Sequence, residues 1–179
     1  MELQDKAKTT SNSLSPWITS MVLLPLMFYF VYNHGKFTFI DYVNLLIHEG
    51  GHGIFSIFGK FIYTLGGTIA QIIIPVMFVI YYWKIKKRNM TQIFLVWLGE
   101  NLINISIYAA DARAHKLPLL GGNRVYHDWT YILNQTNLIM YDYEVGIFFY
   151  SLGILAFLIS FLLPIIMKEY KEINLNLNL

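Results

Sequence analysis

Two histidines and a glutamate form the clearest chemical pattern in the chain. The stretch from His48 to His52, His-Glu-Gly-Gly-His, is an H-E-x-x-H sequence within a segment of helical periodicity. At 3.6 residues per turn, histidines four positions apart project from one helix face, where their imidazoles can take two corners of a tetrahedral zinc site. Glu49 lies beside them, able to reach a metal-bound water. The pattern predicts zinc-dependent hydrolysis, with His48 and His52 as ligands and Glu49 as the catalytic base that activates this water.

The surroundings of the motif favour a bound cation over a purely structural role. The segment from residue 37 to residue 58 is apolar in outline, yet it also contains Asp41 and Asn44. Burying a carboxylate and two imidazoles among apolar residues costs several kcal/mol unless something pairs with them, and a cation is the simplest partner. The alternative is that these side chains only satisfy one another inside a helix bundle. Gly50 and Gly51 cost about 1 kcal/mol each in a helix interior, and we expect them to leave room for a second helix or a substrate strand.

A catalytic zinc site needs a third protein ligand and an open position. The candidates outside the motif share one hydrophilic connection, which runs from residue 111 to residue 144; they are Asp111, His115, His127 and Asp128. A Gly-Gly turn in this connection leads into a new helix, for which Asp128 is the expected N-cap. We predict His127, just before that cap, as the third ligand, with Asp128 and then Asp111 as the alternatives. An aspartate that is not a ligand is suited to orient a ligating imidazole.

A polar stripe on a later apolar segment is expected to face the protein interior. Asn101, Asn104, Tyr108 and Asp111 recur at intervals of three, four and three residues. Asn101 or Asn104 could hydrogen-bond a substrate backbone or a developing oxyanion. Equally, both could only join helices, the role that we favour for Gln71.

The composition is that of a membrane protein. Of 179 residues, 56% are hydrophobic and only 13% charged, about half the charged share of an ordinary soluble domain. The net charge of +2 provides no basic field that would attract nucleic acid. The absence of cysteine excludes disulfides, Cys-ligated metals and thiol nucleophiles.

Apolar runs of roughly membrane-spanning length predict an all-α, polytopic membrane helix bundle with four to five membrane segments, one of which carries the HEGGH motif. The runs are 17–32, 37–58, 61–83, about 90–110, and 145–167. We expect a polar N-terminal tail at 1–16, a single membrane-embedded domain at 17–168 and a C-terminal tail at 169–179.

Basic residues indicate the orientation of the chain. The densest cluster lies in the loop from Lys84 to Arg88, which the positive-inside rule places in the cytoplasm. If the second run crosses the membrane fully, five spans put the amino terminus outside; if it is re-entrant, the amino terminus lies inside. We expect a multi-pass integral protein of a bacterial inner membrane.

The HEGGH motif in an apolar segment resembles the intramembrane zinc metallopeptidases of the site-2 protease type, including small, divergent bacterial members. This resemblance implies a helical enzyme with bound Zn²⁺ that cleaves a membrane protein or peptide in or near the bilayer. The family's third ligand is an aspartate in an Asn-Pro-Asp-Gly element, which this chain lacks. The nearest substitutes are the stretch from Asn104 to Arg113 and the stretch from Gly121 to Trp129.

Two other functions are compatible with the same residues. A membrane metal-binding or metal-transport protein could hold a passing ion at the HEGGH motif. A catalytically inactive relative could serve as an interaction scaffold.

Overall fold

The computed structural model describes residues 15–33, 36–117 and 126–167, and within these ranges the chain is helical and contains no strand. The expected all-α class is therefore confirmed. The expected C-terminal tail lies outside the described residues, and the N-terminal tail overlaps them only at Ser15 and Pro16. The helical elements in chain order are η1 (Ser15–Trp17), α1 (Ile18–Tyr32), α2 (Phe39–Phe55), η2 (Ser56–Phe58), α3 (Gly59–Lys84), α4 (Arg88–Ala110), α5 (Asp128–Gln135), η4 (Ile139–Tyr141) and α6 (Asp142–Ile166).

Four helical stretches are long and apolar enough to cross a membrane. The second and third apolar runs form a single stretch because the short 3₁₀ turn η2 joins α2 to α3 without a polar break. The hydrophilic connection contains the short helix α5, as expected, and α6 begins within its last residues. The stretches are Ser15–Tyr32, Phe39–Lys84, Arg88–Ala110 and Ile139–Ile166.

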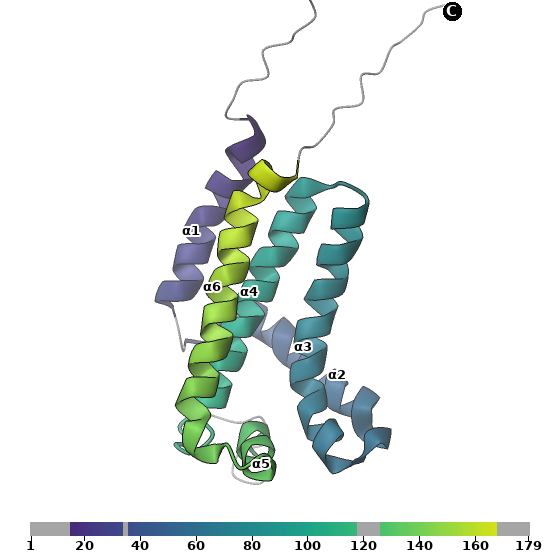
Figure 1. Cartoon of the computed structure of the whole chain (residues 1–179), viewed down its shortest axis with the longest axis vertical. Helices are drawn as coiled ribbons and strands as arrows, with labels where there is room; N and C mark the ends of the chain where they lie inside the picture. Colours follow the sequence, from purple (N-terminus) through teal and green to yellow (C-terminus); the bar gives the residue numbers. More distant parts are fainter. Residues whose placement is uncertain (1–14, 34–35, 118–125, 168–179) are drawn as a thin grey trace, which may run out of the picture.

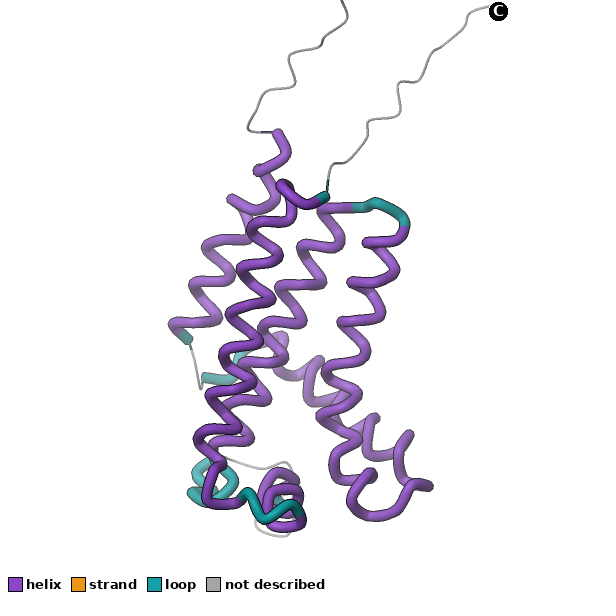
Figure 2. Tube along the Cα trace, viewed as in Figure 1, coloured by secondary structure: helices purple, strands orange, loops and turns teal. Residues whose placement is uncertain are grey.

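Helices α1, α3, α4 and α6 run roughly along the long axis of the molecule (Figure 1). The start of α1, the turn between α3 and α4, and the end of α6 lie at one end, whereas the α2–α3 connection and α5 lie at the other (Figures 1 and 2). The first and last described helices thus share an end with the basic loop from Lys84 to Arg88. This arrangement corresponds to the alternative in which the second apolar run does not cross fully.

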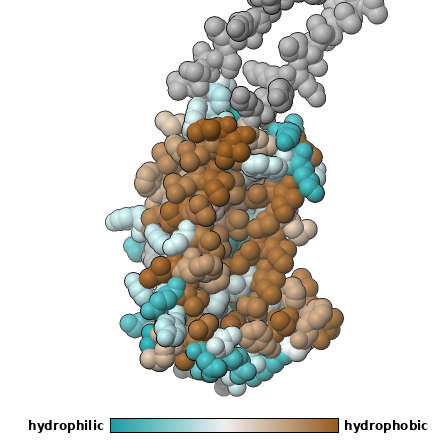
Figure 3. Space-filling view, viewed as in Figure 1, coloured by the Kyte–Doolittle hydropathy of each residue, from teal (hydrophilic) through white to brown (hydrophobic). Residues whose placement is uncertain are grey.

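Many polar side chains are buried in the interior beside the apolar core, and apolar side chains cover much of the outside (Figure 3). Gln92 of α4 is fully buried and donates from Nε2 to Ser20 Oγ of α1 at 2.7 Å and to the Ser160 carbonyl of α6 at 2.9 Å. Large residues such as Val22 and Leu158 are more than half exposed. A lipid environment tolerates apolar side chains outside and requires polar groups to be paired inside.

The helix that carries the motif has a well-defined start and a close neighbour. Thr38 and Asp41 form a capping box at the first turn of α2, which satisfies backbone donors there. Further along, Gly51 meets Gly66 of α3, where an added Cβ on Gly51 would lie 2.3 Å from the Gly66 carbonyl oxygen. The expectation that glycines permit close helix approach is met at this crossing.

Apolar packing holds α5 against α3 and α4. Trp129, Ile132 and Leu133 of α5 are buried in one cluster with Ile105 and Ala109 of α4. Because α5 is only eight residues long, its orientation depends on this burial and on hydrogen bonds from the Asp128 N–H to Tyr108 and from the Thr130 hydroxyl to the Ala112 carbonyl. The first turn of α5 is thereby held close to α2.

Candidate metal centre

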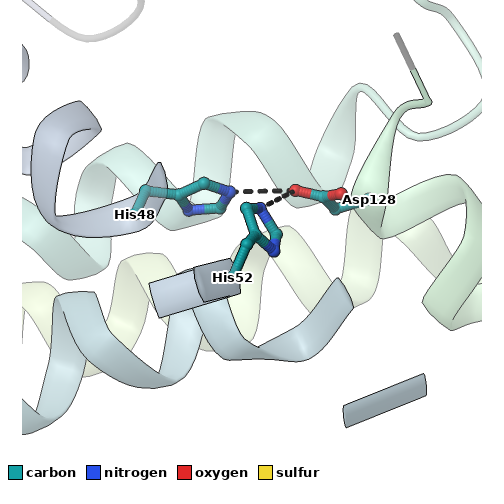
Figure 4. Close-up of side chains that lie close together, drawn as sticks. All are labelled: His48, His52 and Asp128. Atoms are coloured by element: carbon teal, nitrogen blue, oxygen red, sulfur yellow. Dashed lines mark hydrogen bonds and ion pairs between the residues drawn. The ribbon is translucent and has the colours of Figure 1, made fainter. Parts of the chain in front are cut away.

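Three side chains from two separate elements, α2 and α5, meet in the structure (Figure 4). His48 and His52 lie one turn apart on α2, and Asp128 is the first residue of α5. His48 Nε2 lies 2.9 Å and His52 Nε2 3.2 Å from the same oxygen, Asp128 Oδ2. One potential ligand atom from each residue lies within 4.8 Å of the other two, so the group could hold a metal ion.

The Nδ1 nitrogen of each imidazole forms a hydrogen bond with an oxygen outside this group of three residues. His52 Nδ1 lies 2.8 Å from the Tyr63 carbonyl oxygen, and His48 Nδ1 lies 2.8 Å from Gln71 Oε1. A carbonyl oxygen only accepts, so the Nδ1 of His52 carries a proton and, in the neutral ring, Nε2 carries a lone pair. That lone pair faces a carboxylate oxygen, and two acceptors repel unless a proton or a cation lies between them. The donor set therefore fits a bound cation, with hydrogen-bonded imidazoles as found in protein metal sites.

A glycine makes room for one of the imidazoles. An added Cβ on Gly67 of α3 would lie 2.5 Å from His48 Nε2 and 2.6 Å from two ring carbons. Any other residue at this position would displace the His48 ring. Gly50 and Gly53, by contrast, have nothing within 4 Å of an added Cβ, so no other part of the described chain packs against α2 at these positions.

The start of α5 differs from the expected one, and the difference directs Asp128 to the histidines. His127, not Asp128, is the N-cap: its Nδ1 accepts a hydrogen bond from the Thr130 N–H at 3.3 Å. The Asp128 carboxylate is therefore free of the capping role, while its backbone N–H donates to the Tyr108 hydroxyl at 3.1 Å. Burial alone would raise the pKa of the Asp128 carboxyl, but its contacts with the two imidazoles outweigh burial and hold the pKa below its ordinary value. An ionised carboxylate is the form that binds metals.

His127, favoured by sequence as the third ligand, does not join the group that contains His48 and His52. Its imidazole is buried against Tyr108 and His115, with Nε2 at 3.6 Å from Asp111 Oδ2. Burial lowers the pKa of His127, against the opposing charge of Asp111. The group contains Asp128, the first alternative, and this replacement follows from the position of His127 as the helix cap.

The remaining two candidates from the hydrophilic connection have structural partners. Both Asp111 carboxylate oxygens accept backbone N–H groups, from Lys116 and Leu117, at 2.9 Å. His115 Nε2 lies 2.9 Å from the Ala112 carbonyl oxygen. Asp111 and His115 therefore organise the chain after α4.

Glu49 lies beside the group on the exposed side of α2. It precedes the open position at Gly50, and its charge acts on both His52 and Tyr108. No other part of the described chain covers this carboxylate, which lies next to the two histidines. This placement suits a proton acceptor.

The predicted supporting asparagines lie behind the group and not at its open side. Asn104 Nδ2 donates to Asp41 Oδ1 at 2.7 Å, and Asn101 Nδ2 donates to the Trp97 carbonyl at 3.1 Å. Gln71 lies between both asparagines and His48. The contacts of Asn101, Asn104 and Gln71 therefore join helices α2, α3 and α4.

Sequence reasoning assigned no role to Asp41, Asn44 or Tyr63 in this network. Asp41 and Asn44 precede His48 by seven and four residues, so the helical spacing that groups the two histidines also places these side chains on the same face. Asn44 Nδ2 donates to Glu100 Oε2 at 2.6 Å and Asn44 Oδ1 accepts from Trp97 Nε1 at 2.9 Å. Tyr63 contributes its backbone carbonyl, which every residue has. The residue type at position 63 therefore could not predict this contact.

No protein-family model matches the chain, and neither a curated protein nor a solved structure is significantly similar to it.

Proposed function

We propose that the chain is a membrane-embedded, zinc-dependent endopeptidase that hydrolyses a peptide bond in or near the bilayer. The observation that carries the proposal is the convergence of His48, His52 and Asp128 on one point, with the exposed Glu49 beside them. The resemblance of the HEGGH motif to site-2 proteases supports the same reaction class.

Zinc suits these residues better than other common cations. Two imidazole nitrogens and one carboxylate oxygen are a ligand set of the kind found in catalytic zinc sites, in which three protein ligands leave one position open. Calcium and magnesium prefer sites built of oxygen ligands alone. Zinc held here would act as a Lewis acid toward water and toward a peptide carbonyl.

The protein's own groups supply the proton transfers. The Glu49 carboxylate accepts a proton from the attacking water and then delivers it to the nitrogen of the leaving amine. Its exposed position on α2 leaves the carboxylate open to both the attacking water and the leaving amine. Gly50 and Gly53 bound this side with bare backbone, which allows an extended chain to approach.

The substrate is a membrane protein or a membrane-bound peptide. Peptide bonds within a transmembrane helix are engaged in internal hydrogen bonds, so a substrate must unwind locally before its carbonyl is accessible. The metal centre lies at the end of the bundle that carries α5, where hydrophilic side chains gather (Figure 3). Water at this end would stabilise the unwound segment.

The Glu49→Gln variant tests the proposal. Wild type and this variant, purified in detergent, should each bind about one zinc per chain by elemental analysis. Proteomic comparison of membranes should then reveal a protein that is cleaved with wild type and accumulates uncleaved with Glu49→Gln. A variant that binds zinc and leaves every membrane protein cleaved as before would refute peptide hydrolysis. If the same variant instead impaired zinc movement across the membrane, metal transport would replace peptide hydrolysis as the proposed function.

Metal content separates these outcomes from the scaffold function. Replacement of both His48 and His52 by alanine should abolish zinc binding. Wild-type protein that purifies without zinc and does not bind added zinc would leave only the scaffold function.

A further inference from the structure

Gln71 is a buried amide that connects a proposed metal ligand to the helix behind it. Its side chain is 3% exposed, and its Oε1 lies 2.8 Å from His48 Nδ1. Its Nε2 points the other way, toward Asn101 Oδ1 at 3.5 Å and Asn104 Oδ1 at 3.4 Å. Because an amide has a donor end and an acceptor end, the proton position on His48 depends on which end of Gln71 faces it.

The orientation of the Gln71 amide follows from two groups that only accept hydrogen bonds, the Trp97 carbonyl and the Asp41 carboxylate. Asn101 directs its Nδ2 to the Trp97 carbonyl at 3.1 Å, and Asn104 directs its Nδ2 to the Asp41 carboxylate at 2.7 Å. Each asparagine must therefore use its NH₂ group on that contact and present its oxygen to Gln71. Two oxygens on the α4 side require the NH₂ group of Gln71 there, which leaves Oε1 for His48.

We propose that Gln71, oriented by Asn101 and Asn104, is a positioning residue that holds His48 as the Nδ1–H tautomer with the Nε2 lone pair directed to the metal. This inference rests on the proposed metal centre and adds a determinant of its affinity. The reverse orientation of Gln71 would present N–H to His48 Nδ1, place the ring proton on Nε2, and block the ligand atom.

A second histidine shows the same arrangement by a different route. His52 is held in the Nδ1–H form by the backbone carbonyl of Tyr63 at 2.8 Å. A backbone carbonyl cannot be changed by substitution, whereas Gln71 can. His48 is therefore the ligand whose tautomer depends on a side chain that experiment can alter.

The test compares Gln71→Leu with Gln71→Glu and a matched control. Leucine removes the acceptor at similar size, while glutamate keeps an oxygen for His48 Nδ1. Gln92→Leu is the control, because Gln92 is also a fully buried glutamine that joins helices, but its partners are Ser20 and Ser160. All three variants are purified in detergent and compared with wild type by circular dichroism and size-exclusion chromatography.

Two measurements report on the proposal. Zinc affinity, measured by competition with a chromophoric chelator, should fall about 10- to 100-fold in Gln71→Leu, while Gln71→Glu and Gln92→Leu should stay within about threefold of wild type, since each keeps an acceptor at His48. Asp128 faces His48 Nε2 at 2.9 Å and would hold a proton there in metal-free protein, so the tautomer is measured in the Asp128→Ala background. In metal-free protein, ¹⁵N NMR of labelled histidine should show Nδ1–H at His48 in Asp128→Ala and Nε2–H when Gln71→Leu is added. The His48 signals are assigned by their loss in His48→Asn.

The outcomes distinguish this inference from the proposed function. Equal zinc affinity in Gln71→Leu and Gln92→Leu, or an unchanged His48 tautomer when Gln71→Leu is added to Asp128→Ala, would overturn the inference whether or not the protein cleaves peptides. If Gln71→Leu does not fold, two results still decide. Nε2–H at His48 in metal-free Asp128→Ala, or a loss of zinc affinity beyond about threefold in Gln71→Glu, contradicts the argument. A protein that shows the expected tautomers and zinc affinities but cleaves no membrane protein would refute the peptidase and leave the inference standing.

Discussion

Substitution of Gly67 by alanine offers the sharpest test of the metal centre. The added Cβ would lie 2.5 Å from His48 Nε2, whereas ordinary contact begins at 3.4 Å, so the ring must retreat by 0.9 Å. Metal ligands tolerate deviations of only about 0.2 Å. His48 is bonded to Gln71 on one side and faces Asp128 on the other, so the ring has no equivalent position to adopt.

We expect Gly67→Ala to fold and to bind zinc at least about 10-fold more weakly, equivalent to ~1.4 kcal/mol of binding free energy. The fold should persist because alanine is favoured over glycine within a helix by about 1 kcal/mol, and because the clash falls on a ring and not on backbone.

The assay measures zinc affinity by chelator competition and helix content by circular dichroism. Gly50→Ala is the matched control, since an added Cβ there meets nothing within 4 Å, and it should bind zinc as wild type does. If Gly67→Ala folded and bound zinc within twofold of wild type, His48 would not be a ligand in the described position, and the metal centre would have to be rebuilt.

Two further predictions concern the third ligand and the orientation of the chain. Asp128→Ala should weaken zinc binding by about 100-fold or more, because loss of a direct ligand costs at least as much as loss of its supporting group. His127→Asn should bind zinc within about twofold of wild type, since asparagine also caps helices; the opposite ranking would restore His127 as the ligand. Because the chain contains no cysteine, single cysteines at Lys87 and Gln135 can be probed in intact cells with a membrane-impermeant maleimide. Only Gln135→Cys should react if the basic loop is cytoplasmic, and labelling of both would contradict the four-span arrangement.

The membrane helices and the first two candidate ligands follow from local sequence. Hydropathy placed the ends of the last apolar run within three residues of the ends of α6, because lipid exposure selects side chains over a whole helix length. The spacing of His48 and His52 predicts their common face, since positions four apart are neighbours on any α-helix. Neither conclusion needs information about distant parts of the chain.

The third member of the metal group was decided by tertiary structure. His127 and Asp128 are consecutive polar residues at a helix start, and sequence alone does not determine which caps the helix and which points at α2. The packing of Trp129 and Leu133 sets the rotation of α5, and with it the direction of Asp128. The partners of Asn104 and Gln71 have the same origin, since contacts between α2, α3 and α4 depend on how the helices cross. Local periodicity determines the face on which a side chain lies, but only the assembled bundle determines what that face meets.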